Sequence, residues 1–85
     1  MKIYELKPTD NHKSFYGKAI VIEKDNGEKI LQSYETDVCK IKSNGKFVRL
    51  WSGYSATTMR HVNSFVQLFN IAIGGKAWWI AQPVE

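Results

Sequence analysis

The residue types with the most specific chemistry fall in one short stretch, residues 38–51. Asn44-Gly45 is typical of a two-residue hairpin turn, which would set Lys40 opposite Arg49. Like charges that face each other destabilise a strand pair, so this arrangement favours a surface that binds an anion. One face of the hairpin would then carry cations and aromatic rings together: Lys40, Lys42, Phe47, Arg49 and Trp51. Rings that stack on bases, beside cations that hold phosphates, predict a nucleic-acid surface.

A shift of one residue in the turn would exchange the two faces of this hairpin. In the predicted register the opposite face is apolar and would lie on the core. It consists of Cys39, Ile41, Val48 and Leu50. In the alternative register Phe47 and Trp51 turn inward under a helix or the C-terminal tail, and the lysines only protect an edge strand. The sequence leaves both placements open.

The start of a predicted helix offers a second candidate site. Ser55, Thr57 and Thr58 bring hydroxyl groups to the free backbone N–H groups of the first helical turn, where they form a natural anion cradle. Arg60 and His61 follow within two turns and can join the cradle or reach a partner. The simpler interpretation is that the hydroxyl groups only cap the helix and that Arg60 is solvated.

Catalytic and metal-binding patterns are weak. Cys39 falls on the predicted core face, where a thiol is buried and inert. His12 and His61 are far apart in the chain, and one cysteine gives no zinc-ligand spacing. Tyr54, Ser55 and His61 can be combined as nucleophile and base, but no neighbouring residue orients the histidine. We therefore expect no enzyme, no metal and no cofactor.

Length and composition favour one small domain, residues 1–85, without a large cleft. No signal-peptide pattern or long apolar segment occurs, and a single cysteine agrees with a reducing compartment. We expect a cytoplasmic protein that does not enter a membrane. The net charge is +4, and residues 38–84 hold six Lys and Arg but no Asp or Glu. This asymmetry favours a polyanionic or acidic partner, although it would also suit a surface that is merely soluble.

The elements that must position these residues are strands followed by one helix. Strand patterns fill residues 2–51, with hairpin turns at Asp25-Asn26-Gly27 and Asn44-Gly45. A helix is expected at about residues 55–70, because its apolar residues recur at steps of three and four. These residues are Met59, Val62, Phe65, Val66 and Phe69. Gly74-Gly75 would end this helix, and a short helix or strand is expected at about residues 75–81.

This order of elements predicts an α+β fold. We expect an antiparallel sheet of about four or five strands, including two Asn-Gly hairpins, packed against one main C-terminal helix. An unpaired edge strand in such a sheet would allow a homodimer.

Four segments of the chain also resemble segments of known proteins. They are Lys-Ser-Phe-Tyr-Gly-Lys-Ala (residues 13–19), Leu-Gln-Ser-Tyr (31–34), Leu-Trp-Ser-Gly-Tyr-Ser-Ala-Thr-Thr-Met-Arg-His-Val-Asn-Ser-Phe (50–65) and Gly-Lys-Ala-Trp (75–78). Together they resemble a family of small uncharacterised proteins of Gram-positive bacteria, their phages and plasmids. Gly-Tyr-Ser-Ala-Thr-Thr-Met-Arg-His is the most specific segment. The family has no assigned activity, so the resemblance implies no site residues, only a mobile-element setting.

These observations lead to three functional hypotheses. The first is a non-enzymatic protein that binds nucleic acid, or an acidic surface of a host protein that handles nucleic acid, as a regulator or an anti-defence inhibitor of the anti-CRISPR kind. The second is a protein–protein inhibitor or assembly factor without nucleic-acid contacts. The third is a small hydrolase or nuclease around Tyr54, Ser55 and His61.

Overall fold

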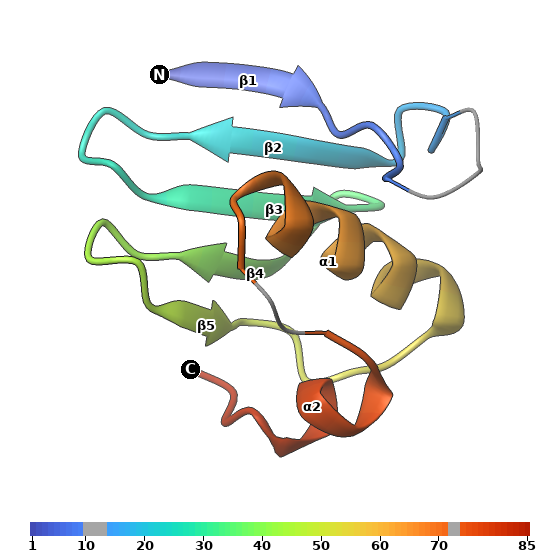
Figure 1. Cartoon of the computed structure of the whole chain (residues 1–85). Helices are drawn as coiled ribbons and strands as arrows, with labels where there is room; N and C mark the ends of the chain where they lie inside the picture. The colour runs from blue at the N-terminus through green and yellow to red at the C-terminus, as the bar shows by residue number, and fades with distance from the viewer. Residues whose placement is uncertain (10–13, 72–73) are drawn as a thin grey trace.

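A five-stranded antiparallel sheet carries the two helices of this chain (Figure 1). The computed structural model describes residues 1–9, 14–71 and 74–85. The strands lie side by side in chain order: β1 (Lys2–Glu5), β2 (Ala19–Glu23), β3 (Lys29–Ser33), β4 (Thr36–Ile41) and β5 (Phe47–Arg49). The main helix is α1 (Ala56–Leu68), and the short helix α2 (Lys76–Ala81) follows it. The predicted α+β fold is confirmed, and the C-terminal segment that the sequence left open is helical.

Helix α1 packs on one face of the sheet, called here the inner face (Figure 1). Because side chains alternate along a strand, every second residue points to this face. Val21, Leu31 and Cys39 are register partners on neighbouring strands, and each is completely buried. Val62 and Phe65 of α1 are buried in the same cluster. Burial of each large apolar side chain stabilises the fold by roughly 1.5–3 kcal/mol.

Helix α1 begins with a side-chain cap. The hydroxyl of Ser55, which has extended backbone angles, accepts a hydrogen bond from the backbone N–H of Thr58 at 3.1 Å. This bond satisfies one of the N–H groups that the first turn leaves free.

We therefore predict that Ser55→Ala lowers the free energy of unfolding by about 1 kcal/mol, because the cap is lost. Ser55→Asp should retain the stability of the unsubstituted protein, since a carboxylate caps equally well and favours the positive end of the helix. Urea unfolding of the two variants tests this. Equal stability of Ser55→Ala and Ser55→Asp would contradict the assigned cap.

Helix α1 ends earlier than the sequence suggested. Asn70 adopts a left-handed φ of 61°, and the N–H of Ile71 donates to the carbonyl of Val66 at 2.8 Å. This is a Schellman ending, for which asparagine is the usual substitute for glycine. The prediction that Gly74-Gly75 ends the helix is therefore wrong, and Gly75 stands at the start of α2 instead.

The hairpin between β4 and β5 has a loop of three residues, not two. The N–H of Lys42 donates to the carbonyl of Lys46 at 2.8 Å, and the N–H of Gly45 donates back to the carbonyl of Lys42 at 2.8 Å. Gly45 has a φ of 89°, as the third residue of such a loop requires. The loop therefore consists of residues 43–45.

This extra loop residue changes the register of the hairpin. Arg49 is the partner of Cys39, and Phe47 is the partner of Ile41. Partners in an antiparallel pair point to the same face, so Arg49 and Phe47 lie on the inner face. The predicted pairs of Lys40 with Arg49 and of Lys42 with Phe47 are wrong, because the shift exchanges the two faces of β5.

The turns fall at two opposite ends of the sheet (Figure 1). The β2–β3 and β4–β5 loops lie at one end. The β3–β4 turn, the segment before β2 and the start of α1 lie together at the other end. This second end gathers residues that are far apart in the sequence.

Candidate functional site

Arg49, the central cation of the predicted basic face, is 6% exposed. Its guanidinium group lies over the ring of Trp79, with its central carbon 4.5 Å from the ring centre. Its N–H groups donate five hydrogen bonds of 2.8–3.4 Å, to the carbonyl groups of Trp51, Ser52, Gly53, Trp79 and Gln82. A guanidinium group has five N–H donors, so these bonds match its whole capacity. Arg49 therefore holds the chain together and offers no donor to an external phosphate.

The two lysines of the predicted face both lie near carboxylates. The Nζ of Lys40 is 3.5 Å from a carboxylate oxygen of Glu28, and that of Lys42 is 3.7 Å from one of Glu85. Lys40 points to the outer face of the sheet, opposite to Arg49. These cations do not form one patch.

The two aromatic residues of the predicted face are also partly covered. The ring centre of Phe47 is 4.7 Å from that of Trp78, so α2 packs over this side chain. Trp51 is half-buried beside the start of α1 and lines a hollow there. The basic, aromatic hairpin face does not form, and Phe47 instead turns inward under the C-terminal segment, as in the alternative register.

We predict that Arg49→Lys lowers the free energy of unfolding by roughly 2–4 kcal/mol. The substitution keeps the positive charge, but an ammonium group cannot make the five hydrogen bonds that the planar guanidinium group donates. Lys46→Ala, at an exposed position directly after the β4–β5 loop, is the control and should change stability by less than about 0.5 kcal/mol. Urea unfolding measures both. A near-neutral Arg49→Lys would mean that Arg49 lies on the surface after all.

The residues predicted at the start of α1 divide between two hollows. Ser55 serves as the cap, and Thr58 is buried beside it; both line one hollow. Thr57 is exposed, and Arg60 is half-buried; both line the neighbouring hollow. The capping interpretation therefore accounts for Ser55, whereas Thr57 and Arg60 lie at the neighbouring hollow.

His61 forms a buried pair that sequence reasoning missed. Its Nδ1 lies 2.8 Å from the hydroxyl oxygen of Ser33, and each residue is only 2% exposed. The ring of Phe15 meets the imidazole edge-on, with the ring centres 4.5 Å apart. Burial, and then the positive charge of Arg60, lower the pKa of His61 below its usual value of 6.5. Ser55, the proposed nucleophile, caps the helix instead. His61 is paired with a different serine, and this serine and His61 are both buried.

The lowered pKa of His61 predicts a pH dependence of stability. The lowered pKa favours the neutral imidazole in the folded protein, so the unfolded chain binds more protons than the folded protein near pH 6.5. Stability should therefore decline as the pH falls from about 7.5 to 5.5, by up to about 1.4 kcal/mol per pH unit. In His61→Gln, whose amide can still bond Ser33, this decline should disappear. Urea midpoints across this range measure the effect, and an equal slope in both proteins would contradict the assignment.

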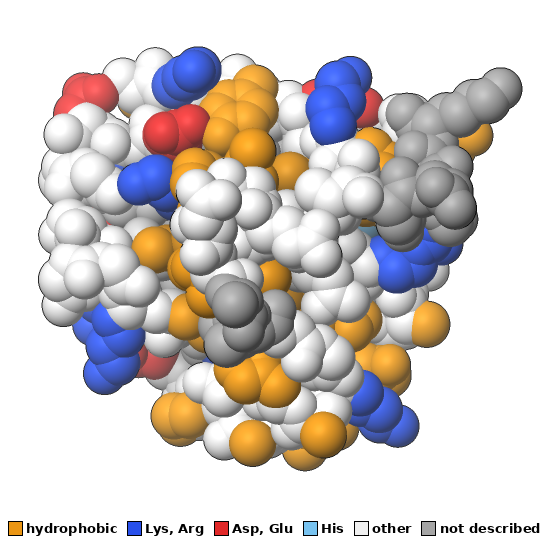
Figure 2. Space-filling view, in the orientation of Figure 1, with side chains coloured by type: hydrophobic (Ala, Val, Ile, Leu, Met, Phe, Trp, Pro, Cys, Tyr) orange, Lys and Arg blue, Asp and Glu red, His pale blue; other side chains and the backbone are white. Residues whose placement is uncertain are grey.

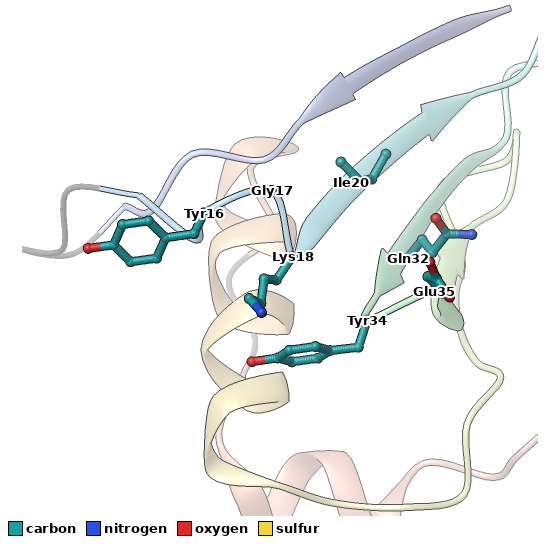
Figure 3. Close-up of a pocket in the computed structure, with 7 residues that line it drawn as sticks. All are labelled: Tyr16, Gly17, Lys18, Ile20, Gln32, Tyr34 and Glu35. Atoms are coloured by element: carbon teal, nitrogen blue, oxygen red, sulfur yellow. The ribbon is translucent and has the colours of Figure 1, made fainter.

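Three hollows meet at Tyr34, at the end of the sheet where α1 starts. The first has a volume of about 580 Å³ and is lined by Tyr16 and Lys18 (Figure 3). The second, of about 240 Å³, reaches Tyr54. The third, of about 200 Å³, reaches Arg60. Tyr34 lines all three, so the hollows adjoin one another at this residue.

Three exposed tyrosines and neighbouring cations define this surface. Tyr16 is 80%, Tyr34 52% and Tyr54 40% exposed. The Nζ of Lys18 lies 5.3 Å from the ring centre of Tyr34, and the Nζ of Lys76 lies 5.0 Å from that of Tyr54. We call this region the tyrosine surface, formed by Tyr16, Lys18, Tyr34, Tyr54, Thr57, Arg60 and Lys76. Figure 2 shows cationic and hydrophobic side chains next to one another on the right of the view, where α1 starts.

Glu5 at the end of β1 positions the segment that carries Tyr16 and Lys18. Its Oε1 accepts hydrogen bonds from the backbone N–H of Gly17 at 3.1 Å and from the hydroxyl of Ser14 at 3.2 Å. The carbonyl of Lys18 in turn accepts from the N–H of Tyr34 at 3.0 Å. These bonds join the tyrosine surface to the edge of the sheet.

The backbone of this surface is held in an unusual conformation. Tyr16, Tyr34 and Glu35 have φ angles of 54°, 49° and 68°, in the left-handed region that favours glycine. Asn70 is the fourth non-glycine residue with positive φ in the described part of the chain. Three of the four therefore line one hollow of the tyrosine surface. Such residues each cost on the order of 1 kcal/mol and cluster at functional sites in proteins.

Few features of the sequence indicate this surface. Tyr34-Glu35 forms the central pair of the tight β3–β4 turn, since Ser33 pairs with Thr36. Two-residue turns of this kind normally contain Asn-Gly or Asp-Gly, and neither pair occurs at this turn, so the sequence did not indicate it. The one local signal was Gly17 after Tyr16, because glycine is common where the chain bends. Nothing in the sequence placed this bend beside α1.

The family to which the chain belongs can now be stated. A family model described as a family of unknown function (DUF8033) matches residues 4–81. The chain belongs to this family. No curated protein and no solved structure matches the chain.

No group of three or more His, Cys, Asp or Glu side chains in the described residues is arranged to hold a metal ion, and His12 lies outside these residues. Neither α1 nor α2, the helices of the described ranges, has the length and apolar character needed to cross a membrane.

Proposed function

We propose that the chain is a non-enzymatic protein that binds nucleic acid through the tyrosine surface. The observation that carries this proposal is the pairing of exposed rings with cations. Lys18 lies beside Tyr34, and Lys76 lies beside Tyr54. Tyrosine rings stack on bases of any sequence, while adjacent ammonium groups neutralise phosphates.

The distribution of charge supports the same proposal. The chain carries a net charge of +4, and residues 38–84 contain no acid. Arg49, Lys40 and Lys42 are taken up by contacts within the chain. Aromatic rings beside cations were predicted for the β4–β5 hairpin and occur instead at the start of α1. The expected ligand class therefore stays nucleic acid, whereas the residues that would bind it differ.

The biological setting is proposed from the resemblance to proteins of Gram-positive bacteria, their phages and plasmids. Such a protein would act in the cytoplasm of a bacterial host as a regulator or an anti-defence inhibitor. Nucleic-acid binding would then be the means by which it blocks or directs a nucleic-acid-handling process.

Protein recognition is the second candidate function. Tyr and Arg are enriched in protein interfaces, and the tyrosine surface contains three exposed tyrosines and Arg60. An acidic surface of a host protein would suit it. The two candidates differ in salt dependence, because only phosphate contacts release condensed counterions.

A salt series on paired variants tests the proposal. Fluorescence anisotropy of labelled DNA and RNA oligonucleotides would compare Lys18→Ala/Lys76→Ala with Lys24→Ala/Lys46→Ala. Both variants lose two exposed lysines, but Lys24 and Lys46 lie in or directly next to the loops at the opposite end of the sheet. We expect affinity to fall with salt. The slope of log K against log salt should drop by roughly 1.4 only in Lys18→Ala/Lys76→Ala, since each lost single-strand phosphate contact removes about 0.7.

An equal drop of the salt slope in the two double variants would place the binding outside the tyrosine surface. Absence of binding at low salt would contradict nucleic-acid binding altogether and leave protein recognition as the better candidate.

A further inference from the structure

We infer that the hollow between Tyr16 and Tyr34 receives one unpaired base, so that the protein binds single-stranded rather than duplex nucleic acid. This inference rests on the proposed function and names its substrate class. The hollow has a volume of about 580 Å³, within the usual range of small-molecule pockets. It is open to solvent and joins the rest of the tyrosine surface at Tyr34.

The lining of the hollow suits a nucleotide. Tyr16 and Tyr34 project in the same direction from two different segments, with Lys18 between them (Figure 3). Gln32 and Glu35 lie at the opposite side of the hollow, and Ile20 provides an apolar wall. Tyrosine rings can stack on the faces of a base, and amide and carboxylate groups can bond its polar edge. The ammonium group of Lys18 then meets the adjoining phosphate.

The polar groups at the far side are free enough to serve a ligand. Glu35 is exposed at the tip of the β3–β4 turn. The side-chain amide of Gln32 makes only a long contact of 3.4 Å with a carboxylate oxygen of Asp37. At this length it is a weak hydrogen bond, so the amide can exchange it for a base at little cost.

The backbone that carries the two rings is held in place before any ligand arrives. The left-handed φ angles of Tyr16 and Tyr34 are maintained by the bonds from Gly17 to Glu5 and from Tyr34 to Lys18. A ring whose backbone is held in this way loses less freedom on binding, and preorganisation of this kind increases affinity. Strained backbone at both rings of one hollow therefore agrees with a binding role.

A fully paired duplex cannot place a base in this hollow. In a double helix the faces of the bases are covered by stacking, and only their edges reach the grooves. Extrusion of a base from an intact duplex costs a few kcal/mol, whereas a single strand or a bulge exposes a base at much lower cost. A paired duplex offers no base face to the exposed ring of Tyr34, so the hollow selects for an unpaired nucleotide.

The test compares four DNA ligands by anisotropy. They are a short single strand, the fully paired duplex, the duplex with one bulged nucleotide, and the same duplex with an abasic site at the bulge. We expect the single strand and the bulged duplex to bind about tenfold more tightly than the paired and abasic duplexes, because only they offer a base for stacking.

Ring substitutions then assign the effect to the hollow. Tyr34→Leu removes the ring and Tyr34→Phe keeps it, and both change the backbone preferences in a similar way. We expect the leucine variant to bind the single strand about tenfold more weakly than the phenylalanine variant, with the same ratio for Tyr16→Leu against Tyr16→Phe. The affinity for the fully paired duplex should be the same for the leucine and phenylalanine variants at each position.

The outcomes separate this inference from the proposed function. Salt-dependent binding in which the paired duplex equals the single strand, or in which the abasic bulge equals the base-carrying bulge, overturns the unpaired-base site and leaves nucleic-acid binding standing. Equal affinities of the leucine and phenylalanine variants also overturn it. Absence of binding to all four ligands overturns both.

Discussion

The structure depends on one buried cation, Arg49. Its five donated bonds join the end of β5 to the connection before α1 and to the end of α2, and the ring of Trp79 lies against its guanidinium group. The guanidinium group thereby adds to the backbone contact between β5 and the segment after α2, where the N–H of Glu85 donates to the carbonyl of Arg49 at 2.9 Å. By fixing the carbonyl groups of residues 51–53, Arg49 also sets the direction in which Tyr54 and the start of α1 leave the sheet.

Sequence reasoning was sufficient for the elements whose signals are local. The three- and four-residue spacing of apolar residues located α1, and Ser55 marked its start. Alternation and two Asn-Gly turns located the strands. Cys39 was correctly placed on the core, where burial raises the pKa of its thiol. Each of these signals depends on neighbours within a few residues, which is why composition and spacing captured them.

The candidate site could not be predicted in the same way. An Asn-Gly pair is compatible with loops of two or three residues, and the difference of one residue turned Arg49 from the surface into the core. The tyrosine surface combines the segment before β2, the β3–β4 turn and the start of α1. Only the paired strands bring Tyr16, Tyr34 and Tyr54 together, and the turn at Tyr34-Glu35 lacks the residues that usually form it.

The most direct measurement is an NMR titration of isotopically labelled protein with a short single-stranded oligonucleotide. The account predicts that the largest changes in amide chemical shift occur at Tyr16, Lys18, Tyr34 and Tyr54, at the end of the sheet where α1 starts. The amides of the β2–β3 and β4–β5 loops at the other end should remain unchanged. Shifts centred on those loops, or no shifts at saturating oligonucleotide, would contradict it.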